Sequence, residues 1–149
     1  MAEIGFYHLE RTPLDEALPK LLEKAVASGA RVVLRAPDAA AVDHLNRLLW
    51  TYGNASFLPH GSAAEGWPEQ QPIYLTALDE NPNGADILVQ VGGAVAGEIT
   101  AYRRVLDLFD GTDPVALVAA RERWRGYKQD GHVLTYWQQK PRGGWEKKG

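Results

Sequence analysis

The sequence predicts an α/β protein, a single three-layer α/β/α domain built on a mostly parallel sheet. Strand patterns at residues 3–9 and 31–35 each precede a helical pattern, and this alternation is typical of parallel strands joined by crossover helices. The second strand has an uninterrupted apolar centre, as expected of a strand covered on both faces. With 149 residues, of which 45% are hydrophobic and 23% charged, the chain suits one globular domain.

Local signals define the first elements. Residues 3–9 are aromatic and β-prone, and they predict the opening strand. Thr12 and Pro13 predict a helix start, with the hydroxyl as cap and the proline in the first helical position. Pro19 lies inside the helical pattern, so the opening turn is expected to be separate or kinked. Gly29 is expected to end this helix.

The later elements continue the alternation. A second helix ends near Trp50 and is followed by a turn-rich loop at residues 52–72. The remaining elements are strands at 73–78, 87–91 and 99–109 (where 101–104 could instead be helical), a helix at 113–130 and an edge strand at 132–137. These elements predict one domain over residues 1–137, followed by a basic, flexible tail over residues 138–149.

Charge is distributed unevenly along the chain, whose formal net charge is −3. Residues 1–120 contain 8 basic and 16 acidic residues, whereas residues 121–149 contain 8 basic and 3 acidic residues. Basic residues gathered at one end indicate a surface for an anionic partner. The overall pI of 5.8 argues against a protein that coats nucleic acid over its whole surface.

Several functional classes find no support in the sequence. It has no cysteine, no apolar run of about 18 residues and no signal-peptide pattern at its start, so a cytoplasmic protein without a membrane span is expected. No phosphate-binding glycine motif follows the first strand, so the sheet is predicted to be Rossmann-like without a nucleotide-binding loop. The four histidines lack metal-ligand spacing and no serine occupies a nucleophile elbow, so no cofactor, metal or catalytic residue is predicted.

The helix predicted at residues 113–130 carries the most distinctive pattern. At about 100° per residue, its apolar stripe contains Leu117, Ala120, Trp124 and Tyr127. The cations that border this stripe are Arg121, Arg125 and Lys128 on one side and Arg123 on the other. Cations beside aromatic rings indicate a recognition surface for a short acidic, aromatic peptide or for nucleic acid. An ordinary amphipathic helix packed on a sheet is the simpler alternative.

Several segments together resemble a known family, the chi subunit of bacterial DNA polymerase III holoenzyme. The matching segments, in order, are Phe6-Tyr7-His8-Leu9, Arg31-Val32-Val33-Leu34, Leu45-Asn46 with Leu49-Trp50, Ser56-Phe57-Leu58-Pro59-His60, Asp86-Ile87-Leu88-Val89, Val105-Leu106-Asp107 and Ala120-Arg121-Glu122-Arg123-Trp124-Arg125. They extend over residues 3 to about 137, which is nearly the whole chain. The tryptophan-to-histidine block and the arginine-rich block are specific when they occur together.

The resemblance implies a noncatalytic subunit of the clamp-loader assembly. Such a subunit connects the clamp loader, through the psi subunit, to the acidic C-terminal tail of single-stranded-DNA-binding protein, so it would meet DNA only indirectly and would need neither cofactor nor membrane. Where psi is absent, another partner such as a helicase would take its place.

The same resemblance nominates residues for two binding surfaces. For the tail, which ends in phenylalanine, it nominates Arg121, Trp124 and Arg125, with the guanidinium groups receiving the carboxylate and an apolar pocket receiving the ring. Lys128 joins them from helix geometry alone. A family lysine one turn earlier falls on Leu117 here.

The second surface, for psi or another partner, is implied to contain Trp50 and Phe57, with Pro59 and His60 beside them. These rings could instead simply close over the sheet.

Two other functions fit parts of the sequence. A direct single-stranded nucleic-acid-binding module could use Trp124, Tyr127 and the basic tail as a stacking platform, although residues 1–120 are acidic overall. A small hydrolase or nucleotide enzyme on the same sheet is disfavoured, because the phosphate loop and a catalytic triad are missing.

Overall fold

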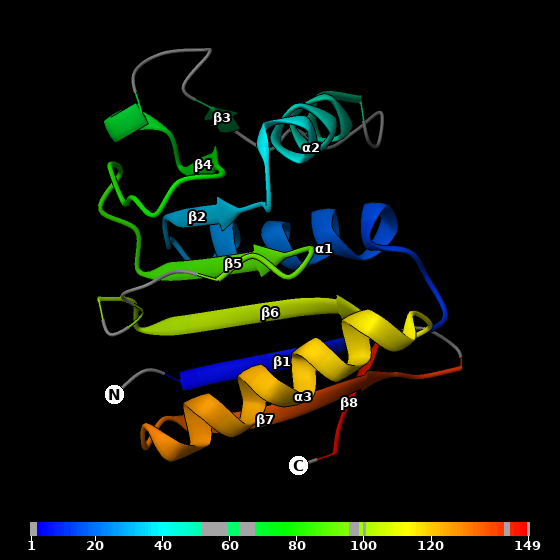
Figure 1. The fold of residues 1–149 in the computed structure, drawn as a ribbon. Coiled ribbons are helices and arrows are strands. Elements are labelled where there is room, and N and C mark those ends of the chain that lie inside the picture. The colour runs from blue at the N-terminus through cyan, green and yellow to red at the C-terminus, as the bar shows by residue number, and fades with distance from the viewer. Residues whose placement is uncertain are drawn as a thin grey trace.

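The computed structural model describes residues 3–51, 60–62, 68–95, 99, 101–141 and 144–148. In this part of the chain an eight-stranded sheet has the order β3-β4-β2-β5-β6-β1-β7-β8 (Figure 1). The strands are β1 (Glu3–Leu9), β2 (Val32–Arg35), β3 (His60–Ser62), β4 (Ile73–Thr76), β5 (Ile87–Val91), β6 (Arg104–Asp110), β7 (Val133–Gln139) and β8 (Trp145–Lys147). Neighbouring strands are parallel from β3 to β7, and β8 joins β7 antiparallel. The mostly parallel sheet is therefore confirmed.

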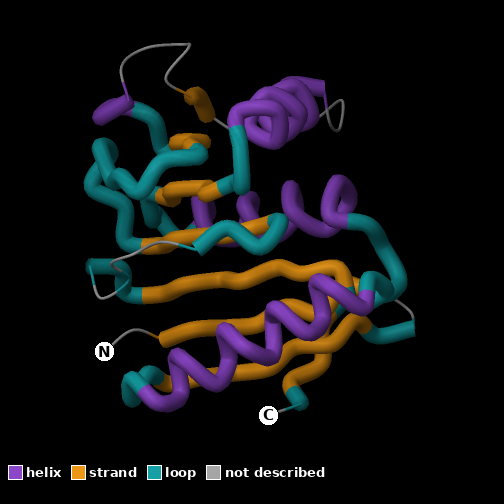
Figure 2. Tube along the Cα trace, in the orientation of Figure 1, coloured by secondary structure: helices purple, strands orange, loops and turns teal. Residues whose placement is uncertain are grey.

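Among the described residues, three α-helices cover the two faces of this sheet. The helices are α1 (Leu14–Ala27), α2 (Ala39–Thr51) and α3 (Pro114–Gln129), and a 3-10 turn, η2, spans Pro68–Gln70. The ribbon and tube views show α3 crossing the front of the sheet, with α1 on the other side (Figures 1 and 2). The apolar residues of α1 and α2 join one core cluster and those of α3 join a second. The three-layer α/β/α arrangement predicted from the sequence is confirmed. None of these described helices combines the length and apolar character needed to cross a bilayer.

Strand β1 lies inside the sheet, between β6 and β7, and supplies both cores. Its side chains alternate between the faces, so Tyr7 and Leu9 pack in the cluster beneath α1 and α2, whereas Ile4 and Phe6 pack beneath α3. The chain leaves β1 toward α1 and leaves β6 toward α3. These two adjacent strands therefore mark the point where the connections change face.

Two predicted element starts are wrong. Pro13, not Thr12, is the N-cap of α1, and the cap makes no side-chain hydrogen bond. The Thr12 hydroxyl instead accepts a hydrogen bond from Gln139, at the other end of the chain. The helix also continues through Pro19 without a separate opening turn. Strand β6 begins at Arg104 rather than at residue 99, because the preceding residues form a turn in which the Tyr102 amide donates to the Ile99 carbonyl at 3.1 Å.

Two short strands escape the sequence patterns. Strand β3 forms the far edge of the sheet beside β4, and β8 forms the other edge beside β7. Strand β7, predicted to be an edge strand, is therefore an inner strand. Part of the segment assigned to the basic tail forms β8, in which Trp145 is opposite Gln139.

Candidate functional site

The third helix is fixed at its start by local chemistry. Asp113 is the N-cap and its carboxylate accepts a hydrogen bond from the Val115 amide at 3.0 Å, while Pro114 occupies the first turn. The predicted apolar stripe faces the sheet. Its members Ala120 and Tyr127 are buried, and Leu117 and Trp124 are partly buried against the same cluster.

A pocket of about 310 Å³ lies between this helix and the strands below it. We call it the α3 pocket; its lining residues are Phe6, His8, Phe109, Leu117, Ala120, Arg121, Trp124, Arg125 and Tyr136. They come from β1, β6, β7 and α3, which the parallel pairing of β1 with β6 and β7 brings together. Three of the nominated residues, Arg121, Trp124 and Arg125, therefore line one pocket.

Aromatic rings fix the shape of the α3 pocket. The Trp124 indole contacts the Phe6 ring edge to face, with centroids 5.3 Å apart, and meets the Tyr136 ring at 6.1 Å and 79°. Edge-to-face pairs of this kind are favourable and restrict the rotamers of the rings. The pocket therefore has a preformed, largely apolar floor.

The rim of the α3 pocket is cationic. Arg121 and Arg125 are both exposed. Arg125 makes only a 3.5 Å contact with Glu122, one turn earlier on the helix, and both groups are exposed. Arg121 has no ion pair within the described part of the chain. Burial raises the pKa of the Tyr136 hydroxyl and Glu10 adds to that shift, whereas Arg121 lowers it. The rim can therefore hold an anion directly above the aromatic floor.

His8 is a pocket residue that the sequence analysis missed. Its Nδ1 hydrogen bonds with the Tyr136 hydroxyl, and its Nε2 lies 3.8 Å from the Glu10 carboxylate. The alternation of β1 puts His8 on the same face as Ile4 and Phe6, beneath α3. The alternation of side chains along β1 is the sequence feature that could have predicted this position for His8.

Arg123 has a different role from its neighbours. It forms a two-point ion pair with Asp107, through Nε–Oδ2 at 2.7 Å and Nη2–Oδ1 at 2.9 Å. Gln90 donates from its Nε2 to both the Asp107 carboxylate and the Tyr127 hydroxyl, each at 3.0 Å. This buried network attaches α3 to the sheet. It also places Tyr127 in the core, where its ring cannot serve as a stacking platform for nucleic acid.

Lys128 lies outside the α3 pocket. It is exposed one turn beyond Trp124 and lines a shallow, open depression together with Glu122, Arg125 and Gln129. Arg125 therefore borders both hollows. Leu117 forms part of the apolar wall of the pocket.

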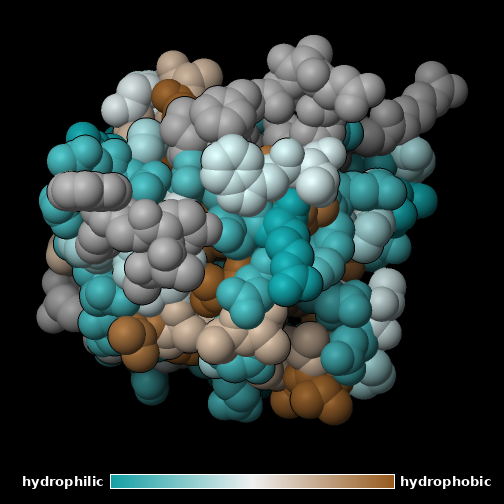
Figure 3. Space-filling view, turned by 90° about the horizontal axis from the view of Figure 1, so that it is seen from above, coloured by the Kyte–Doolittle hydropathy of each residue, from teal (hydrophilic) through white to brown (hydrophobic). Residues whose placement is uncertain are grey.

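The second nominated surface is only partly described. Trp50, at the end of α2, is 54% exposed, and its ring lies 4.7 Å from the ring of His60, which is buried and hydrogen bonded to the Asn46 carbonyl at 3.2 Å. The other two nominated residues, Phe57 and Pro59, lie outside the described residues. The view from above, on the side where α2 lies, shows a described surface that is mainly hydrophilic (Figure 3). The half-exposed Trp50 indole near the end of α2 is a candidate anchor for a partner.

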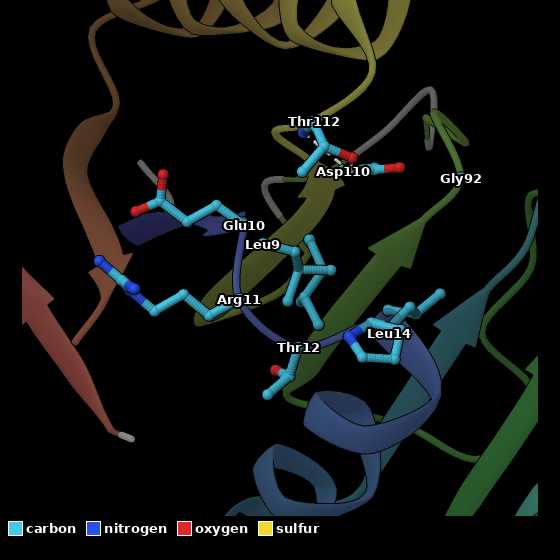
Figure 4. A pocket seen from close by; sticks show the side chains of 10 residues that line it. Leu9, Glu10, Arg11, Thr12, Leu14, Gly92, Asp110 and Thr112 are labelled. Atoms are coloured by element: carbon cyan, nitrogen blue, oxygen red, sulfur yellow. Dashed lines mark hydrogen bonds between the residues drawn. The ribbon is translucent and has the colours of Figure 1, made fainter. Parts of the chain in front are cut away.

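In open α/β sheets ligands usually bind at the switch point, which here lies between β1 and β6. A cavity of about 350 Å³ lies at the carboxyl ends of these strands, with Leu9, Asp110 and Thr112 in its lining (Figure 4). The backbone amides of Glu10, Arg11 and Thr12 all donate to the Gln139 side-chain oxygen, at 2.9, 2.7 and 3.2 Å. Amides at this turn hold phosphate in nucleotide-binding folds. Here the chain's own glutamine occupies them, in keeping with the predicted lack of a nucleotide-binding loop.

Possible metal ligands are scattered. Across the residues that the structure describes, no three histidine or acidic side chains are grouped closely enough to hold a metal ion.

Comparison with known proteins places the chain in a family. A sequence model of the family described as "DNA polymerase III chi subunit, HolC" matches residues 1–135. The "DNA polymerase III subunit chi" of Pseudomonas aeruginosa is 30% identical over 137 residues, which cover 90% of this chain and 94% of that protein. The protein of the same name from Escherichia coli K12 is 30% identical over 109 residues, covering 72% of this chain and 74% of that protein. A "Probable DNA polymerase III subunit chi" of Rickettsia prowazekii is 32% identical over 109 residues, covering 73% of this chain but only 66% of the Rickettsia protein. The chain therefore belongs to the DNA polymerase III chi subunit family.

Proposed function

We propose that this protein is a noncatalytic, cytoplasmic replication accessory subunit that binds the acidic, phenylalanine-terminated tail of single-stranded-DNA-binding protein in the α3 pocket. Through its second surface it would connect that protein to the clamp-loader assembly. One observation carries the proposal: Arg121, Trp124 and Arg125 line a single pocket with an aromatic floor and a cationic rim. A ligand that ends in a phenyl ring beside a carboxylate matches both features.

The chemistry of each contact follows from the pocket. The terminal phenyl ring would enter between Phe6, Trp124 and Tyr136, where ring-to-ring contacts add to apolar burial. The terminal carboxylate would meet the Arg121 guanidinium, which has no ion-pair partner of its own in the described chain. Acidic residues preceding the phenylalanine would run past Arg125 toward Lys128.

Leu117 changes the balance of these contacts. A basic residue at this position would add a charge to the rim, whereas leucine extends the apolar wall. We therefore expect a modest affinity for the tail, which falls as salt is added but keeps a salt-resistant part from ring burial.

The decisive experiment titrates the protein with a short acidic peptide ending in Pro-Phe. Arg121→Ala should weaken binding at least about tenfold, since a hydrogen bond to a charged group contributes about 1.5–3 kcal/mol. The free energy of unfolding should stay within about 0.5 kcal/mol of the wild-type value, because Arg121 is exposed.

Arg103→Ala is the matched control for this experiment. Arg103 is also an exposed arginine, but it lies in the turn before β6, outside the lining of the α3 pocket. Its loss should leave the affinity unchanged. Peptide binding that survives Arg121→Ala, or that falls equally in both variants, would refute the tail assignment.

For the second surface, we propose that Trp50 and His60, with Phe57 and Pro59, contact the psi subunit, or another component where psi is absent. The half-exposed indole supports this assignment. Trp50→Ala should abolish capture of the partner while changing the free energy of unfolding by less than about 1 kcal/mol.

Leu78→Ala is the control for this surface, because Leu78 is 66% exposed and follows β4. A partner list that is identical for wild-type protein, Trp50→Ala and Phe57→Ala would show that these rings only close over the sheet.

Direct binding of nucleic acid by Trp124 and Tyr127 is not part of this proposal. Tyr127 is 8% exposed and its hydroxyl is engaged by Gln90, while Trp124 contacts Phe6 and Tyr136. The buried Tyr127 ring therefore offers no face on which a base could stack, which removes one of the two rings of that platform.

A further inference from the structure

A further hollow lies on the face of the sheet opposite the α3 pocket, where α1 approaches the end of β7 and the start of β8. We call it the basic groove; it has a volume of about 330 Å³. Its lining residues are Arg11, Thr12, Glu16, Ala17, Lys20, Leu21, Lys24, Gln139, Lys140, Pro141, Gly144 and Trp145. Four of these are cations and only Glu16 is a carboxylate. The two sides of the groove come from opposite ends of the chain.

The groove is built by specific contacts. The Gln139 side chain connects the end of β7 to the turn after β1, through the amides of residues 10–12 and the Thr12 hydroxyl. This connection brings Lys140 and Arg11 to one hollow. Trp145 packs edge to face against Tyr7, with centroids 5.0 Å apart, which fixes the indole in the groove wall.

The cations of the groove are available to a ligand. Arg11, Lys20, Lys24 and Lys140 are all exposed, and within the described chain none of them forms a side-chain ion pair. Lys20 and Lys24 are four residues apart on α1 and therefore share a face. Residues 1–120 contain only 8 basic residues against 16 acidic ones, yet three of the 8 line this groove. Positive charge is concentrated here against the trend of the sequence.

Figure 4 shows how Arg11 reaches the groove. Its side chain and that of Glu10 extend toward β7 and β8, away from Asp110 and Thr112 at the switch point. Arg11 therefore faces the same side of the molecule as Lys140. The Glu10 carboxylate lies 3.8 Å from the Nε2 atom of His8. Glu10 is not among the residues that line the groove.

We propose that the basic groove binds the phosphodiester backbone of single-stranded nucleic acid. Phosphates would lie between the α1 lysines on one side and Arg11 and Lys140 on the other, and the indole of Trp145 offers an aromatic surface to an unpaired base. A duplex has no free base to present to that ring. The groove lies on the α1 face and the α3 pocket on the α3 face, so one molecule can hold a strand and a peptide together.

The salt dependence of oligo-dT binding tests this proposal. With single strands, each phosphate contact contributes about −0.7 to the slope of log affinity against log salt, so four cations predict a slope of about −2.8. Lys20→Ala/Lys24→Ala should reduce the steepness of that slope by about 1.4 and weaken binding at low salt. Both positions are exposed on a helix, where alanine is well tolerated.

Arg47→Ala/Arg103→Ala is the matched control, because it removes the same charge from two exposed sites outside the groove. It should preserve the slope. Arg121→Ala should also keep oligo-dT binding while losing binding of the acidic peptide. The proposals for the basic groove and for the α3 pocket can therefore be refuted separately.

Four results would overturn the groove assignment. The first is undetectable binding of oligo-dT at low salt, and the second is an equal loss of oligo-dT affinity in the lysine variant and the control variant. The third is a duplex of the same length that binds as tightly as oligo-dT. The fourth is an acidic peptide without phenylalanine that binds through the two lysines in place of oligo-dT.

Discussion

Two arginines of α3 that are two positions apart lie in opposite environments. Arg123 is 11% exposed at its side chain and makes a two-point ion pair with Asp107, whereas Arg121 is exposed at the rim of the α3 pocket. Residues two apart on a helix point about 200° away from each other, so Arg123 faces the buried network and Arg121 faces the α3 pocket. The position of each arginine around the helix axis, and not the residue type, therefore decides whether it is buried or lines the pocket.

The Asp107–Arg123 pair gives a prediction about stability. Asp107→Asn should lower the free energy of unfolding by about 3–5 kcal/mol, because it leaves the Arg123 charge buried without its counter-ion. Urea denaturation measures this value. Glu122→Gln is the control, since its pair with Arg125 is exposed on both sides and should contribute less than about 1 kcal/mol. Similar effects from the two substitutions would contradict the structural role of the buried pair.

At the scale of single elements, α3 is attached to the sheet at both ends and forms one wall of the α3 pocket. Its N-cap and the Gln90–Tyr127 contact hold the helix at both ends, while Leu117, Arg121 and Trp124 form the wall between them. Affinity for a ligand benefits when the binding residues are already ordered. The helix therefore supplies a preorganised wall.

Gly126 lowers the stability of α3. It lies inside α3, and a Cβ added there would meet no atom within 4 Å. Gly126→Ala should raise the free energy of unfolding by about 0.5–1 kcal/mol, because alanine loses less backbone entropy in a helix. Thermal or urea unfolding gives the value, and affinity for the acidic peptide should stay unchanged.

Gly111→Ala provides the contrast to this substitution. A Cβ at that position would lie 1.8 Å from His8 Nε2, so it must displace a side chain that lines the pocket. Loss of peptide affinity in Gly126→Ala, or its full retention in Gly111→Ala, would contradict the assigned roles.

At the scale of the whole molecule, the first and last parts of the chain are fastened together. Gln139 accepts from three backbone amides of the turn after β1, and β7 pairs along β1. Gln139→Ala should lower the free energy of unfolding by about 1 kcal/mol, since water can replace only part of these hydrogen bonds. Gln138→Ala is the control, because this neighbouring glutamine makes no such side-chain contact with the turn. Equal stability of the two variants would show that the connection is dispensable.

The sequence predicts much of the fold and those lining residues of the α3 pocket that lie on α3. Helices of 13 to 16 residues and buried strands carry strong periodic signals, so all three α-helices and the inner strands were found. Strands β3 and β8 have three residues each and exist because a neighbouring strand pairs with them. No local pattern of three residues can report such a pairing.

The same distinction applies to the α3 pocket. Arg121, Trp124 and Arg125 belong to one helix, so spacing alone placed them together. Phe6, His8 and Tyr136 complete the floor from strands that are more than a hundred residues apart in the sequence, and only the pairing of β1 with β7 joins them. The spacing along α3 therefore predicts the cations of the rim, whereas the cavity beneath them depends on strand pairing and leaves no local pattern in the sequence.

The position of β1 between β6 and β7 has a consequence for synthesis of the protein. Phe6 and His8, in the floor of the α3 pocket, leave the ribosome before α3, whereas Tyr136 leaves after it. A nascent or prematurely terminated chain would display the cations of α3 without the cavity beneath them. A chain that ends before β7 would therefore lack the pocket that the proposed function requires.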